Sequence, residues 1–293
     1  MSRYLDPKAD VVFKKIFGQH PHLLKHFLNA VLPLPEDEQI ISLEYLSNEQ
    51  VPPIPSFKYT IVDVRCKDSL GRTFIVEMQI QWTTSFMQRM LFGTSTAYVR
   101  QLEKGEKYHL LKPVYGLWLI DDIFDKEDAS WYHHYKLVNT ERPEREIKDL
   151  QLVFIELPKF QSSTVSEKKL QILWLRFMSQ LDARTKEIPA EWLTVPEIKQ
   201  AVELAEEAAY TPSELAAYDK YWDAVSTERT LIEGKFEEGV VKGRAEGKAE
   251  GCVEKRNQII FTMLSRGMSD EDIMQIADIS REELALLKNE KDG

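Results

Sequence analysis

Hydrophobic and polar residues alternate in two neighbouring segments of the chain's first half. Residues 73–81 carry apolar side chains at the even positions, whereas polar side chains such as Glu77 and Gln79 occupy odd positions. A period of two is typical of a β-strand with one buried face. The pattern therefore predicts strands over residues 59–66 and 73–81, joined by the polar, glycine-containing turn at 68–72.

The length of that turn predicts how the two strands pair. If the apolar faces coincide, a hairpin with a five-residue loop places Val64 opposite Val76. The same register places Asp63 directly opposite Glu77, with Cβ atoms about 5 Å apart. The hairpin is thus expected to present two carboxylates side by side on its polar face.

The remaining periodicity predicts an α+β N-terminal half and an all-helical C-terminal half. Apolar residues at helical spacing, i and i+3 or i+4, alternate along the first half with short apolar runs that are typical of buried strands. Helices are expected over residues 10–17, 23–31, 86–103, 168–181, 195–209 and 213–226, and further strands over 40–45, 113–120 and 150–157. His133 and His134 are expected in a loop or at a strand edge.

The chain is expected to contain four parts: a core over 1–162, a helical extension over 163–232, a glycine-repeat segment over 233–256 and a small trihelical unit over 257–293. In the third part, glycine recurs every four residues, at Gly239, Gly243, Gly247 and Gly251. Interior glycine costs a helix about 1 kcal/mol relative to alanine. The segment is therefore either a flexible charged linker or a helix that self-associates through its glycine column.

The last part shows two clear helix starts. Ser269 and Ser280 are each followed three residues later by an acidic residue, which is the pattern of a capping box. The third helix of this unit has no net positive charge, which favours a role in protein contacts over reading of DNA bases.

Two opposed carboxylates repel each other unless a positive charge lies between them. Asp63 and Glu77, with a main-chain carbonyl and water, would form the oxygen site that Mg²⁺ or Mn²⁺ prefers. Such an ion activates water and stabilises charge on a phosphodiester. Gln79 would lie beside the ion, where it could orient the water or bind a phosphate oxygen. The alternative is a solvated hairpin face whose acids pair with Arg65 or another basic residue.

At this point the residues carry a resemblance. Asp63 followed by Glu77-Met-Gln79 is similar to the PD-(D/E)XK nuclease motif in its E-x-Q form. Together with other segments in the same order, it resembles the Rpn family of recombination-promoting nucleases and transposases. Those segments are Asp10–Gly18, Phe86–Arg89, Tyr98–Leu102, Gly105–Pro113, Phe154–Phe160 and Trp174–Phe177.

The resemblance implies a restriction-endonuclease-like fold, with a mixed β-sheet flanked by helices, and metal-dependent cleavage of DNA linked to recombination, mobile elements or defence. It implies catalytic roles for Asp63, Glu77 and Gln79 and a metal site formed by Asp63, Glu77 and Asp10. Gln79 occupies the position that is lysine in the founding motif, and it supplies neither a charge nor a general base. A catalytically weak or inactive DNA-binding, self-assembling module with the same fold is therefore the alternative.

Three basic residues are candidates for contacts with DNA phosphates. Lys14 lies on the first predicted helix, where solvated lysines are also common. Arg89 and Arg100 are 11 residues apart, about three helical turns, and can share one face of the helix after the Glu77 strand. Salt bridges to the acidic half are the alternative for this pair.

Composition narrows the range of partners and compartments. The formal net charge of the chain is -10, but the first 120 residues hold 14 Lys and Arg against 12 Asp and Glu, a balance of +2. DNA is therefore expected to bind the N-terminal half. A second copy of the chain is expected to bind at the glycine repeat. Cys66 and Cys252 are too few for a disulfide framework, and neither an export signal nor an apolar run long enough for a membrane is visible. These features are typical of a cytoplasmic protein, and the resemblance implies that it is bacterial.

Overall fold

The computed structural model describes residues 3–50, 60–61, 63–83, 85–161 and 169–292. The chain forms two compact units, Met1–Val225 and Ser226–Gly293. Among the described residues, no helix is both long enough and apolar enough to cross a membrane.

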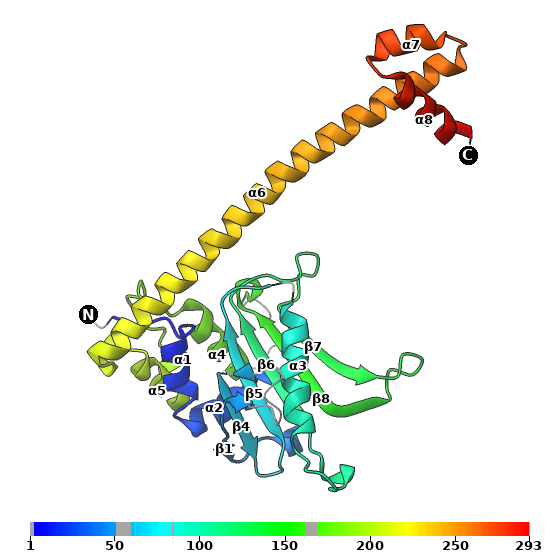
Figure 1. The fold of residues 1–293 in the computed structure, drawn as a ribbon. Coiled ribbons are helices and arrows are strands. Elements are labelled where there is room, and N and C mark those ends of the chain that lie inside the picture. Colours follow the sequence, from blue (N-terminus) through cyan, green and yellow to red (C-terminus); the bar gives the residue numbers. More distant parts are fainter. Residues whose placement is uncertain (1–2, 51–59, 62, 84, 162–168, 293) are drawn as a thin grey trace. The chain divides into compact units, whose positions relative to one another are not determined.

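The first unit contains a mixed sheet of six strands in the order β1-β4-β5-β6-β8-β7 (Figure 1). The central strands β5, β6 and β8 are parallel, whereas β1, β4 and β7 run antiparallel to their neighbours. The strands are β1 Leu43–Tyr45, β4 Val64–Asp68, β5 Thr73–Gln79, β6 Val114–Ile120, β7 Tyr132–Val138 and β8 Glu146–Glu156. A separate pair is formed by β2 Glu49–Gln50 and β3 Thr60–Ile61.

Helices cover both faces of this sheet, which explains why every residue of β6 is buried. One face packs against α1 Asp10–Phe17, α2 Pro21–Val31, α4 Lys169–Gln180 and α5 Pro196–Leu204. The other face packs against α3 Phe86–Val99, the crossover between the parallel strands β5 and β6. This mixed sheet with flanking helices confirms the predicted fold class.

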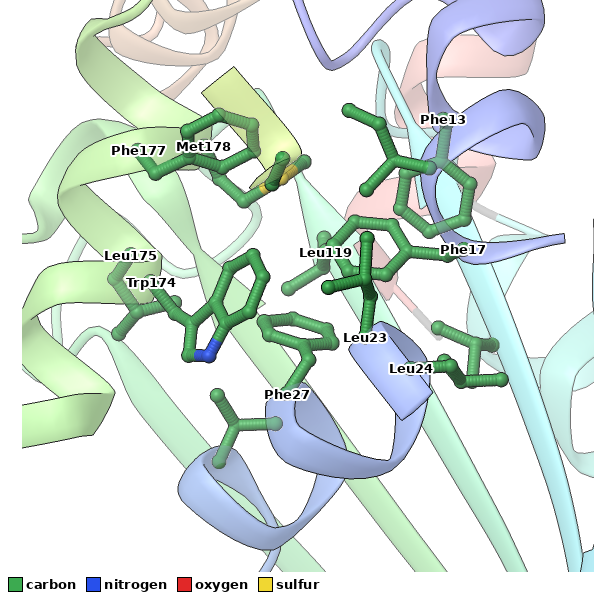
Figure 2. Close-up of a cluster of buried hydrophobic side chains, with 14 of the residues drawn as sticks. Phe13, Phe17, Leu23, Leu24, Phe27, Leu119, Trp174, Leu175, Phe177 and Met178 are labelled. Carbon is green, nitrogen blue, oxygen red and sulfur yellow. The ribbon is translucent and has the colours of Figure 1, made fainter. Parts of the chain in front are cut away.

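The main hydrophobic core lies between the sheet and the four-helix face (Figure 2). Phe17 packs against Phe27 with ring centroids 4.9 Å apart, and Trp174 meets Phe27 edge-on at 5.5 Å. The core thus joins the first two helices to α4. The indole N–H of Trp174 in α4 also donates a 2.8 Å hydrogen bond to Nδ1 of His26 in α2, although the two residues are 148 positions apart in the sequence.

The β4–β5 hairpin confirms the predicted register. Val64 pairs with Val76 and Cys66 pairs with Phe74, and all four side chains are buried in the main core. Of the first predicted strand, residues 60–61 belong to β3, whereas residues 59 and 62 lie outside the described residues. The turn keeps its polar residues at 68–72, where Gly71 adopts a φ of 83°.

Several element boundaries differ from the predictions. The helix predicted over 195–209 ends at Leu204, and the helix predicted over 213–226 continues without a break to Ser265. The helix predicted to end at residue 103 ends at Val99, because the following residues turn back toward β6. The edge strand β7 holds His133 and His134, and the periodicity of its sequence gave no separate strand there.

After α4 and α5, the helical half continues with α6 Pro212–Ser265, a helix of 54 residues that contains the glycine repeat. In the second unit, the end of α6, α7 Asp270–Ala277 and α8 Arg281–Asp292 surround a small core centred on Ile260 and Ile273. Both predicted capping boxes are confirmed. The Asp272 N–H donates to the Ser269 hydroxyl at 3.2 Å, and the Glu283 N–H donates to the Ser280 hydroxyl at 3.1 Å.

Candidate active site

The carboxyl ends of the three parallel strands meet at one edge of the sheet. Gln79 pairs with Ile120 and Ile120 pairs with Glu156, so the polar residues that follow these strands gather at the same edge. Asp63 immediately precedes the antiparallel strand β4 and therefore lies at this edge too. In open sheets with parallel strands, this edge is where ligands usually bind.

Asp63 and Glu77 form a carboxylate pair at that edge. One carboxylate oxygen of Asp63, Oδ2, accepts a 2.8 Å hydrogen bond from the main-chain N–H of Met78. Burial, followed by the charge of Asp63, raises the pKa of Glu77 to about 8. Burial also raises the pKa of Asp63, although the Met78 hydrogen bond opposes this change. Without a cation, the pair therefore retains a proton near neutral pH.

Gln79 points its amide at a cation on the next helix. Its nitrogen donates to the carbonyl of Gln81 at 2.7 Å, and its oxygen accepts from Nη2 of Arg89 at 2.8 Å. The guanidinium carbon of Arg89 also lies 5.0 Å from the ring centre of the buried Phe86. The positive charge of Arg89 favours the ionised forms of both Asp63 and Glu77, because it lowers the pKa of each.

The first helix brings two more of the predicted residues to the site. Asp10 is the first residue of α1 and forms a 2.7 Å ion pair with Lys14, one turn later. The negative charge of Asp10 raises the pKa of Asp63, whereas the positive charge of Lys14 lowers it. Asp10 therefore acts as a neighbour of the carboxylate pair and as a first-turn acid at the same time.

Arg100 does not join this group. It is the residue after the last turn of α3, whereas Arg89 lies in the first turns of that helix. A helix of this length spans about 20 Å. Arg100 lies near Arg65 instead, and its charge contributes to a lowered pKa of that guanidinium.

Four polar residues at the site escaped the sequence analysis. The ammonium group of Lys8 lies 3.2 Å from Asp6 and 3.7 Å from Asp121, the residue that follows β6. Tyr221, from the first turns of α6, donates a 3.4 Å hydrogen bond to the carbonyl of Lys8. Burial and then the charges of four nearby acids raise the pKa of Tyr221; these acids are Asp10, Asp63, Asp6 and Asp121. The sequence did offer a signal for Asp121, because it is an acidic residue directly after an apolar run that is typical of a buried strand.

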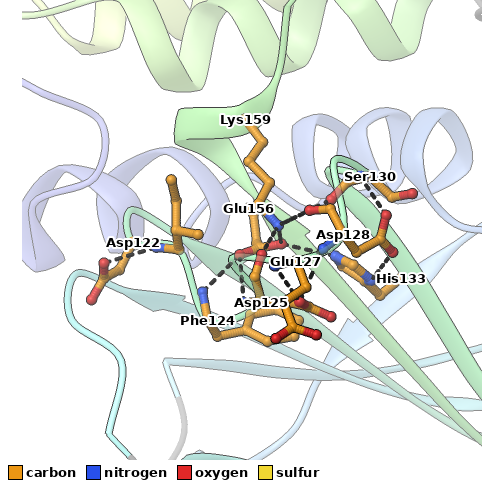
Figure 3. Close-up of polar contacts among 10 residues, drawn as sticks. Asp122, Phe124, Asp125, Glu127, Asp128, Ser130, His133, Glu156 and Lys159 are labelled. Atoms are coloured by element: carbon orange, nitrogen blue, oxygen red, sulfur yellow. Dashed lines mark hydrogen bonds and ion pairs between the residues drawn. The ribbon is translucent and has the colours of Figure 1, made fainter.

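The loop after β6 is held in place by a fully buried carboxylate, that of Glu156 (Figure 3). Glu156 accepts hydrogen bonds from the N–H of Phe124 at 2.7 Å, from Nε2 of His133 at 2.9 Å and from the ammonium group of Lys159 at 2.6 Å. Lys159 also donates to the carbonyls of Asp125 and Asp128 in that loop. These contacts fix the loop that starts at Asp121, next to the carboxylate pair.

The donor set fits a magnesium-type ion better than a zinc-type ion. In the described part of the chain, no three His, Cys, Asp or Glu side chains are placed to hold a metal together. Mg²⁺ commonly binds through one or two carboxylates and keeps its other positions for water and substrate phosphate. Asp63 and Glu77 supply these two carboxylates, and a bound cation would oppose the burial and the charge repulsion that raise the pKa of Glu77.

Comparison with protein families gives a match that includes both carboxylates of the pair, Asp63 and Glu77. The model of the PD-(D/E)XK nuclease family transposases matches residues 7–234, which is most of the chain. The chain belongs to this PD-(D/E)XK nuclease family. Comparisons with curated proteins and with solved structures gave no match. Membership of the PD-(D/E)XK nuclease family confirms the resemblance seen in the sequence and agrees with the mixed sheet and its flanking helices.

Proposed function

We propose that the protein is a divalent-metal-dependent DNA endonuclease that hydrolyses phosphodiester bonds, in recombination, mobile-element or defence reactions. The observation that carries this proposal is the partly buried pair of Asp63 and Glu77, whose charges are poorly compensated by the protein alone. Membership of a nuclease family supports the choice of DNA as the substrate.

Asp63 and Glu77 would hold Mg²⁺ or Mn²⁺, with Asp10 beside them. The bound ion would stabilise negative charge on the scissile phosphate and lower the pKa of a coordinated water. The Met78 N–H orients Asp63, because it binds one carboxylate oxygen and leaves the other available. Lys14 and Arg89 are the basic residues at the site that would contact DNA phosphates. The position of Arg100 at the far end of α3 would suit a more distant phosphate.

Nicking of supercoiled plasmid by the full chain tests this function. Wild type and Asp63→Ala would be compared in Mg²⁺, Mn²⁺ or Ca²⁺, with Glu44→Ala as a control because Glu44 is an exposed acid on the edge strand β1. We expect nicking by wild type and by the control, and none by Asp63→Ala. Equal nicking by wild type and Asp63→Ala would rule out this site.

The alternative function is a weak or inactive DNA-binding module that self-assembles, and one feature of the second unit supports the self-assembly. In α6, the exposed residues Ile232, Phe236 and Val240 follow one another at four-residue intervals. Added Cβ atoms at Gly243 and Gly247 would meet nothing within 4 Å. This unpaired side of α6 supports a homo-oligomer formed through the glycine repeat, in either functional case.

Light scattering on wild type and Phe236→Ser tests the oligomer, with Thr230→Ser as the control. A lower mass for Phe236→Ser alone is expected, and a monomeric wild type would contradict self-association.

Cys66 and Cys252 are both free thiols, which agrees with the proposed cytoplasmic location.

A further inference from the structure

The site has no lysine at the position where the founding nuclease motif carries one. Gln79 occupies that position, on the same face of β5 as Glu77. A glutamine carries no charge, so it cannot offset the negative charge that builds up on a phosphate during hydrolysis. Another cation must do this if the site cleaves DNA.

The hydrogen bonds of Gln79 show where its amide is used. Its nitrogen donates to the carbonyl of Gln81, and this contact turns the amide oxygen toward Nη2 of Arg89. Both ends of the amide are therefore engaged within the protein. Gln79 acts as a positioning residue for Arg89, whereas the sequence alone suggested that it would orient water or phosphate.

Two lysines at the site are already bound to acids. Lys14 pairs with Asp10 at 2.7 Å, and Lys8 lies between Asp6 and Asp121. Among the described residues, no carboxylate lies within ion-pair distance of Arg89. Its side chain is exposed to solvent, so a substrate can reach it.

Arg89 is also well anchored for a residue that reaches the surface. Phe86, one turn earlier in α3, is fully buried beside Trp118, and the guanidinium of Arg89 lies over the Phe86 ring. The guanidinium has five N–H donors in a planar fork, and the amide oxygen of Gln79 accepts a hydrogen bond from one N–H of Nη2. The remaining donors match the paired oxygens of a phosphate.

We propose that Arg89 supplies the positive charge that lysine provides in the founding motif, by donating hydrogen bonds to a non-bridging oxygen of the scissile phosphate. This inference rests on the proposed endonuclease function. In the reaction, the water oxygen forms a bond to phosphorus and gives a proton to solvent, while the P–O bond to the leaving sugar oxygen breaks and that oxygen takes up a proton from solvent. Arg89 keeps its own proton throughout, because its guanidinium stays protonated, and it acts through its charge and its hydrogen bonds.

Four variants of the full chain test this role: Arg89→Ala, Arg89→Lys, the double variant Gln79→Lys/Arg89→Ala, and, as the control, Arg142→Ala at an exposed arginine between β7 and β8. Plasmid-nicking rates at saturating metal would be measured against DNA concentration, so that kcat and KM are separated. Thermal unfolding would show that each variant is folded.

We expect Arg89→Ala to lower kcat about 100-fold with a smaller change in KM, because the lost contact forms fully only in the transition state. Lysine at position 79 should restore part of kcat in the double variant, and millimolar guanidinium should do so in Arg89→Ala. Arg89→Lys should keep an intermediate rate, and Arg142→Ala should keep the wild-type kcat.

Three results would overturn the inference: a wild-type kcat in Arg89→Ala, an effect of Arg89→Ala on KM alone, or failure of both lysine and guanidinium to restore a folded Arg89→Ala. If Arg89→Ala fails to fold, the kcat of Arg89→Lys decides, and a wild-type value would overturn the inference. Failure of the proposed function is distinguishable, because then wild type itself would cleave no better than Asp63→Ala.

Discussion

Replacing Glu77 with glutamine should stabilise the metal-free protein, and the gain should grow with pH. The carboxyl group of Glu77 has a pKa of about 8 in the folded chain, raised from 4.5 by burial and by the charge of Asp63. A raised pKa means that the folded state holds this proton more tightly than the unfolded state does. Wild-type stability should therefore fall as pH rises from 4.5 to about 8, and Glu77→Gln should lack this loss.

The size of the effect follows from the two pKa values. Because the unfolded chain ionises this carboxyl group more readily, the raised pKa lowers the free energy of unfolding by about 3 kcal/mol at pH 7 and about 1 kcal/mol at pH 5. Because the side chain is only partly buried, solvent screening lowers the difference between these two pH values to about 1 kcal/mol. In a unit of this size, that difference corresponds to about 3 °C in melting temperature.

Thermal unfolding in EDTA at pH 5 and pH 7 measures the difference, with Glu44→Gln as the exposed control. Glu77→Gln should melt above wild type by a margin that is larger at pH 7. Addition of Mg²⁺ should then stabilise wild type more than the variant. A variant that melts at or below wild type at pH 7 would show that repulsion between the two carboxylates does not destabilise the metal-free protein.

Two further predictions concern the support of the site. Lys159→Met should destabilise the first unit by about 3 kcal/mol, because it removes a charge partner of the fully buried Glu156; urea unfolding measures this, and an effect no larger than that of the exposed Lys126→Met would contradict it. Gly116→Ala should cost about 2 kcal/mol or more, because an added Cβ would lie 2.0 Å from the buried ring of Trp118; a variant with the wild-type urea midpoint would contradict that packing.

The hairpin of the site could be derived from the sequence because two local rules determine it. Alternation decides which face of each strand is buried, and the turn length decides the register, so Val64 and Val76 pair as expected. The long apolar runs at residues 113–120 and 150–157 indicated strands buried on both faces, and β6 and β8 include most of both runs. The glycine repeat left two interpretations open, because helix propensity alone does not decide between them; these residues lie within α6.

The rest of the site depends on contacts between distant parts of the chain. Tyr221 approaches Asp63 across 158 positions of sequence, and no periodicity relates them. Arg89 and Arg100 are close in the sequence and can share one helix face. That spacing does not indicate which end of the helix meets the site. Only the position of α3 on the sheet separates Arg89 at the site from Arg100 beside Arg65.

The central claim is that Asp63 and Glu77 hold a metal ion for cleavage of DNA. Plasmid nicking in Mg²⁺ or Mn²⁺ by wild type and by Asp63→Ala, each confirmed as folded, tests it most directly. The account predicts metal-dependent nicking that EDTA abolishes and that Asp63→Ala lacks. Nicking that persists in Asp63→Ala, or a wild type that cleaves under no divalent metal, would contradict it.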